Sequence, residues 1–126
     1  MALPKRVMRR GSHYKGYKLS VVGSGDNVLN ITFTQACAVN GISLTPDDYD
    51  GDDYMTLEHI DSNGNVVKTL GETIYNIGSN VSTILDFMAL ELFTVGETLR
   101  LTYSSANGVT MTVHALLERI DSAKDN

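Results

Sequence analysis

The feature that most constrains the fold of this sequence is an alternation of apolar and polar residues that begins near Tyr17. In 29–34, 98–103 and 109–115 every second residue is apolar, and the residues between them are mostly Thr, Asn or Arg. Such alternation buries one face of a β-strand and leaves the other face in water. The abundance of Thr and of β-branched residues also fits a half-buried pleated surface. The sequence therefore predicts a β protein.

Turn signals punctuate these apolar runs. Asn-Gly occurs at 40–41, 63–64 and 107–108, and the glycine-rich stretch 23–27 is a fourth turn candidate. Asn and Gly tolerate the positive φ of tight hairpin turns, so we expect hairpins at the three Asn-Gly sites. Short strands at this spacing are typical of a sandwich or barrel rather than of a parallel α/β sheet. The predicted strands are 17–22, 28–39, 42–45, 54–61, 65–70, 73–77, 84–93, 97–104 and 109–119.

The segment 80–93 carries two competing patterns. Val81, Ile84, Leu85 and Met88 recur at helical spacing, and Asn80 is a candidate N-cap. The end of the same segment alternates as a strand does. We therefore predict a helical turn over 80–86, followed by a strand.

Charge divides the chain into two unequal parts. Residues 1–18 hold six basic side chains and no acid, which gives +6; the remaining four basic residues and all fifteen acids give −11 to residues 19–126. The length fits one domain. We predict a flexible basic N-terminal arm over 1–16, a β-sandwich domain over 17–120 and a C-terminal tail over 121–126.

Several classes of protein are excluded or disfavoured by composition. With Cys37 as the one cysteine, the chain forms no internal disulfide and no cysteine-based metal site. No apolar run approaches the roughly 18 residues of a membrane span. The basic N-terminus is not followed by the apolar core of a signal peptide, so we expect a soluble chain that is not secreted by that route. Nucleophile elbows, phosphate-binding glycine loops and His-Glu-x-x-His are missing, so we expect neither an enzyme nor a cofactor, although carboxylates paired in space stay open.

The arm is the first candidate site. Its basic side chains could pair with an acidic protein surface or neutralise phosphates, and its tyrosines could stack on bases. Protein docking is favoured because the acidic body offers a complementary surface within a homo-oligomer. A nucleic-acid role and a plain solvated tail are the alternatives. The candidate partner-binding residues are Lys5, Arg6, Arg9, Arg10, Lys15, Lys18, Tyr14 and Tyr17.

An acidic loop is the second candidate. Residues 47–53 contain five Asp, and Asp48, Asp50 and Asp52 have a spacing that could offer oxygens to Ca²⁺. The EF-hand template fails because the glycine is misplaced and no helix pattern flanks the loop. A solvated acidic tip is the favoured interpretation, and no metal is assigned.

The histidines and the cysteine carry weaker signals. His13, His59 and His114 are far apart in sequence and lack partners at metal-ligand spacing. We interpret His59, at a core edge, and His114, on a wet strand face, as strand histidines with nearby hydrogen-bond partners. Cys37 lies in an apolar run and is expected to be a buried thiol. A carbohydrate-binding module stays open, with Tyr49, Tyr54, Tyr75 and Tyr103 as its candidate aromatics.

A basic arm before an all-β domain with Asn-Gly turns and no disulfide resembles the small capsid decoration or cement proteins of tailed bacteriophages. The segment 93–120 is similar in style to the closing hairpin of such sandwiches. The resemblance implies an antiparallel β-sandwich of jelly-roll type with an extended N-terminal arm and at most one short helix. It also implies a non-enzymatic virion protein on the capsid surface, made in the host cytoplasm.

The resemblance implies partners as well. Cement proteins bridge capsid subunits and commonly assemble as trimers, so the expected partners are the major capsid protein or other virion proteins, and other copies of the chain. Phage neck and tail proteins share the same features. The apolar side chains assigned to the core rather than to an interface are Leu99, Leu101, Val109, Met111 and Val113.

Overall fold

The computed structural model describes residues 13–48, 52–75, 83–108 and 110–121. All regular secondary structure in these residues is β-strand. The strands are β1 (His13–Val21), β2 (Gly25–Thr32), β3 (Cys37–Pro46), β4 (Tyr54–Ile60), β5 (Val66–Tyr75), β6 (Thr83–Phe93), β7 (Thr98–Ser105) and β8 (Met111–Asp121). The all-β prediction is confirmed. No helix long and apolar enough to cross a membrane occurs in the described ranges.

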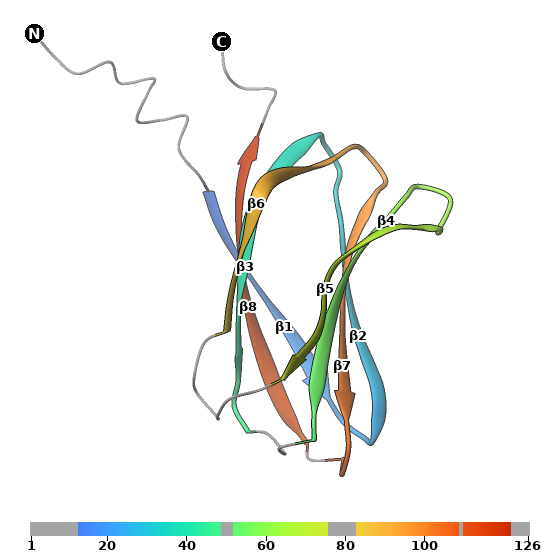
Figure 1. Cartoon of the computed structure of the whole chain (residues 1–126), viewed down its shortest axis with the longest axis vertical. Coiled ribbons are helices and arrows are strands. Elements are labelled where there is room, and N and C mark those ends of the chain that lie inside the picture. Colours follow the sequence, from blue (N-terminus) through green and yellow to red (C-terminus); the bar gives the residue numbers. More distant parts are fainter. Residues whose placement is uncertain (1–12, 49–51, 76–82, 109, 122–126) are drawn as a thin grey trace, which may run out of the picture.

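The strands form two four-stranded antiparallel sheets that face each other (Figure 1). The first sheet has the order β1-β8-β3-β6 and the second has the order β2-β7-β4-β5. Antiparallel pairs therefore alternate between the sheets: the first sheet holds β1–β8 and β3–β6, and the second holds β2–β7 and β4–β5. A two-stranded ribbon rolled around a core gives this order. This is the arrangement of an eight-stranded jelly roll, so the predicted sandwich of jelly-roll type is confirmed.

The core lies between the inner faces of the two sheets. Alternate residues of β4 and β7 are buried, which is what the period-two pattern requires. Fully burying such a side chain stabilises the fold by about 1.5–3 kcal/mol. Of the predicted core residues, Leu99, Leu101 and Val113 are buried and Met111 packs against them, while Val109 lies outside the described residues. Cys37 is buried as a free thiol, as predicted.

One Asn-Gly turn closes a hairpin. Asn63-Gly64 joins β4 to β5, and Gly64 has a φ of 89°. The Asp61 carboxylate accepts backbone N–H groups from Asn63 at 2.9 Å and Asn65 at 2.8 Å. Because the side chain satisfies the turn's own donors, this turn is fixed locally by sequence.

Two other predicted turns form, but they do not close hairpins. The stretch 23–27 joins β1 to β2, and Asn107-Gly108 joins β7 to β8; each therefore passes from one sheet to the other. Gly25 and Gly108 take positive φ values of 90° and 73°. The turn predicted at 23–27 is confirmed, whereas the hairpin expected at 107–108 was wrong, because the Asn-Gly dipeptide encodes a local bend and not the partner of the next strand.

Asn40-Gly41 is not a turn between two strands. It lies inside β3, where the register shifts between Val39 and Gly41 against both neighbours, β6 and β8. Against β8 the shift leaves one extra residue in β3, which is a β-bulge, whereas against β6 the extra residues belong to β6. The Asn40 side chain donates to Glu118 Oε2 at 3.2 Å. The predicted break at 40–41 is wrong because β3 is held by strands on both sides.

Three further boundaries are corrected. The predicted helical turn over 80–86 is wrong for 83–86, which pair with β3 as part of β6, and 80–82 lie outside the described residues. The predicted strand 28–39 is two strands, β2 and β3, and the predicted strands 65–70 and 73–77 contribute to one, β5.

The predicted limits of the β-domain are also too narrow. His13–Gly16, which we assigned to the flexible arm, pair with β8 from His13↔Arg119 onward, and β8 extends to Asp121. The ladder orders these residues although they lack an apolar period. Residues 1–12 and 122–126 lie outside the described part of the chain.

Candidate functional site

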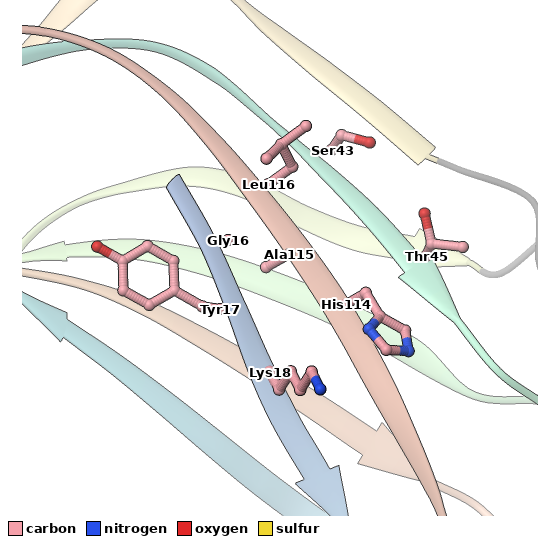
Figure 2. Close-up of a pocket in the computed structure, with 8 residues that line it drawn as sticks. All are labelled: Gly16, Tyr17, Lys18, Ser43, Thr45, His114, Ala115 and Leu116. Carbon is pink, nitrogen blue, oxygen red and sulfur yellow. The ribbon is translucent and has the colours of Figure 1, made fainter. Parts of the chain in front are cut away.

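A groove of about 570 Å³ crosses the outer face of the first sheet. Strands β1, β8 and β3 supply its walls. Figure 2 shows side chains from these strands gathered on one side of β1, with the Tyr17 ring directed to the other side. The lining residues are Gly16, Tyr17, Lys18, Ser43, Thr45, His114, Ala115 and Leu116.

Strand register explains why these residues meet. Gly16 lies opposite Leu116, which in turn lies opposite Ser43; in the next row Lys18, His114 and Thr45 are aligned in the same way. Residues two apart on a strand share a face. The two rows therefore form one continuous outward surface.

Gly16 makes the surface concave. A Cβ atom at this position would meet nothing closer than the Ala115 carbonyl oxygen at 4.0 Å, so the space above the glycine is open. The neighbouring Leu116 side chain is 45% exposed and forms an apolar wall beside this space. A glycine inside a strand often marks close approach of a ligand or of another backbone.

A histidine–aspartate pair closes one end of the groove. His114 Nε2 lies 3.0 Å from Asp47 Oδ1, and both side chains are about half exposed. The Asp47 backbone N–H donates to the Thr112 carbonyl at 2.9 Å, which fixes the residue beside β8. An exposed pair of this kind contributes about 0–1 kcal/mol to stability. Its main effect is to orient the imidazole at the groove.

The structure separates the predicted partner-binding residues. Tyr14 and Lys18 are exposed on the outer face of the first sheet, with Gly16 between them. Lys15 and Tyr17 lie on the opposite face, where Lys15 Nζ is 5.6 Å from the centre of the Tyr17 ring. Lys5, Arg6, Arg9 and Arg10 lie outside the described residues.

Tyr17 packs partly against the core. Burial raises the pKa of its hydroxyl above the usual value, and the charge of Arg119 opposes this effect. The hydroxyl therefore stays protonated at neutral pH and can donate a hydrogen bond.

The acidic loop does not form a metal site in its described part. Asp48 and Asp52 are exposed, Asp50 lies outside the described residues, and no group of three potential ligands occurs among the residues that are described. Asp53 is different because it is buried. It accepts hydrogen bonds from the Tyr103 hydroxyl at 2.6 Å and the Ala106 backbone N–H at 2.7 Å. Asp53 thus ties the end of this loop to β7 and the turn after it.

An ionic network lies apart from the groove, between the edges of the two sheets. His59 Nδ1 is 2.6 Å from Glu91 Oε2, and His59 Nε2 is 3.0 Å from Glu97 Oε1. Lys68 Nζ reaches the other Glu91 oxygen at 3.2 Å. The His59 ring also contacts the Phe93 ring in a tilted arrangement, with centroids 4.1 Å apart. His59 is thus a buried strand histidine with hydrogen-bond partners, as predicted, and His114 likewise has Asp47.

Sequence reasoning missed the groove. Gly16 was assigned to the arm and Asp47 to the acidic loop, while Ser43 and Thr45 carried no motif because they are brought beside His114 only by strand pairing. The usable signal was a glycine between two outward-facing positions, Tyr14 and Lys18. The partners of His59 were missed for the same reason, since they lie on other strands.

No family model matches the chain, and no curated protein matches it. Among solved structures, the chain is similar to a CocE/NonD family hydrolase from Staphylococcus aureus, with 12% identity, a TM-score of 0.46 and coverage of 88% of this chain and 33% of that one. It is also similar to the structure of infectious bursal disease virus Gx strain (11% identity, TM-score 0.43, coverage 90% and 33%). A VP2 subviral particle of that virus gives 11% identity, a TM-score of 0.43 and coverage of 91% and 34%. The chain spans about a third of the length of these structures.

Proposed function

We propose that the chain is a non-enzymatic structural protein of a virus particle, a decoration or cement protein that joins capsid subunits. The observation that carries this proposal is the division of charge between residues 1–18, at +6, and residues 19–126, at −11. A separate basic segment is suited to docking on acidic protein surfaces, and its attraction weakens as salt rises. The compact jelly roll would then be the part displayed on the shell.

The point where the basic segment enters the fold supports this role. β1 is the end strand of the first sheet and pairs with β8 alone among the described strands. An end strand presents N–H and C=O groups along its free side, to which a strand of another protein can add. Tyr14, Lys15 and Lys18 are exposed along β1. Lys15 and Lys18 of the basic segment therefore lie on a strand whose free side could pair with a partner.

An apolar row supports association of the β-domain with itself or with a neighbour. On the outer face of the first sheet, Ala38 lies opposite both Ile120 and Leu92; Leu92 is 67% exposed and Ile120 is partly exposed, while Ala38 is buried. Contiguous apolar side chains at a surface are typical of protein interfaces. We expect the chain to form an oligomer, with a trimer favoured, and its mass in solution checks this directly.

Particles of the virus that encodes the chain provide the test. We expect the chain to co-purify with gradient-purified capsids, to lie on their outer surface by labelled-antibody electron microscopy, and to be released by high salt. Recovery with isolated tails or necks would assign it to those assemblies instead. Absence from all purified particles would overturn the proposal. Binding to free DNA at low salt that requires residues 2–12 would favour a nucleic-acid role.

A further inference from the structure

Gly16 is a glycine that the fold itself does not require. Its φ is not in the left-handed region, and a Cβ atom would have open space above it. In the interior of β1 a glycine destabilises the strand relative to alanine. Neither backbone strain nor packing accounts for this cost. The missing side chain instead creates the hollow at the middle of the groove.

The floor and one wall of the groove are apolar. Leu116 lies directly opposite Gly16 and lines the groove, and Tyr14 is 64% exposed on the same face one row away, outside the lining. Small-molecule sites commonly combine apolar and aromatic surface with a few polar groups that fix the orientation of the ligand. The C–H face of a sugar ring can rest on such a surface.

The polar groups around the hollow offer both kinds of hydrogen-bond partner. The Lys18 ammonium donates only, the Asp47 carboxylate accepts only, and the Ser43 hydroxyl can do both. Thr45 and His114 complete this row. A ligand that suits them presents several hydroxyl groups, each of which can donate and accept.

Charge narrows the ligand class further. The positive charge of Lys18 is accompanied by the negative charge of Asp47 at the same end of the groove, and Glu118 adds a second carboxylate next to Tyr14. A phosphate or carboxylate group drawn to Lys18 would therefore also meet Asp47. An uncharged ligand avoids this repulsion.

We propose that this groove binds a short uncharged saccharide. The groove volume, about 570 Å³, lies within the range of small-molecule sites. The ring would pack over Gly16 and against Leu116, and its hydroxyls would meet Lys18, Ser43 and the His114–Asp47 pair. This site is additional to the proposed role in the particle, which depends on the basic segment.

The test is an NMR titration of the full chain with glucose, galactose, mannose and N-acetylglucosamine at millimolar concentrations. We expect at least one sugar to cause saturable shifts in the amides of 14–18, 43–45 and 114–116. Gly16→Leu fills the hollow and should abolish these shifts. Gly23→Leu is the matched control, because a Cβ at Gly23 meets no atom within 4 Å and Gly23 lies outside the groove. Spectra of the unliganded variants establish that both fold.

Three results would overturn the proposal. The first is the absence of saturable shifts with every sugar. The second is a stronger response to inorganic phosphate or glucuronate, which would make the groove an anion site. The third is unchanged sugar binding by Gly16→Leu. None of these results bears on co-purification of the chain with capsids, so failure here is distinguishable from failure of the particle role.

Discussion

At the scale of single residues, the polar groups inside the sandwich connect parts of the chain that sequence separates widely. His59 on β4 joins Glu91 on β6, so one ring links the two sheets. Asp53 joins the acidic loop to Tyr103 and Ala106. A buried polar group without its partner is costly, so each of these contacts constrains the fold strongly.

Asp53→Ala should destabilise the protein by about 2–4 kcal/mol, because the buried Tyr103 hydroxyl and the Ala106 N–H both lose their acceptor. Urea unfolding at neutral pH measures the change. Asp52→Ala, which alters an exposed carboxylate in the same loop, should stay within about 0.5 kcal/mol of the wild type. Equal effects of the two substitutions would contradict the anchoring role of Asp53.

The lowered pKa of Glu97 predicts that the folded protein loses stability in acid. A hydrogen bond from the Thr94 backbone N–H holds the pKa of this carboxyl below its usual value. His59 also lowers this pKa, although burial opposes both effects. Because the folded pKa is the lower one, the stabilisation is complete above the unfolded pKa of about 4.3 and is lost as pH falls through the folded pKa.

Glu97→Gln should therefore be less stable than the wild type at neutral pH and should lose less stability on acidification. Urea midpoints measured from neutral pH down to about pH 3 give both slopes. Parallel slopes for wild type and variant would show that Glu97 does not contribute to the acid response.

At the scale of secondary-structure elements, turns with the same sequence have different structural roles. Asn63-Gly64 closes a hairpin, Asn107-Gly108 passes between sheets, and Asn40-Gly41 forms a bulge inside β3. The dipeptide specifies where the backbone can bend. The strands on either side decide what that bend connects.

Gly64→Ala should lower the free energy of unfolding by about 1–2 kcal/mol, because a Cβ is strained at the positive φ of this residue. Gly23→Ala is the matched control, since its φ is not in the left-handed region and its Cβ would have space. We expect it to be neutral or slightly stabilising. Thermal or urea unfolding compares the two, and equal losses would contradict the strain argument.

The strands themselves were largely predictable, because alternation such as that of 98–103 records burial on one face. The sheet order was not, since no residue of β1 encodes its pairing with β8. The helical pattern at 83–86 was overridden by pairing with β3. The full lining of the groove could not be predicted either, because Gly16, Leu116 and Ser43 are brought together by register.

At the scale of the whole molecule, the division of charge organises the proposed function. A jelly roll whose apolar residues fill the space between its two sheets is a stable unit for display. The basic segment leads directly into β1, at the edge of the first sheet, so docking need not disturb the core. The groove lies on the outer face of that sheet, on the strand that the segment enters.

Restoring the chain to particles stripped of it tests the central claim most directly. Capsids are incubated with equal amounts of folded full-length chain or of a variant lacking residues 2–12, which retains all of β1, and the bound chain is quantified by mass spectrometry. We expect the complete chain to occupy its sites fully at low salt and less as salt rises. We expect the folded truncated variant to lose most of this binding. Equal occupancy by the two would contradict the claim that the basic segment anchors the protein.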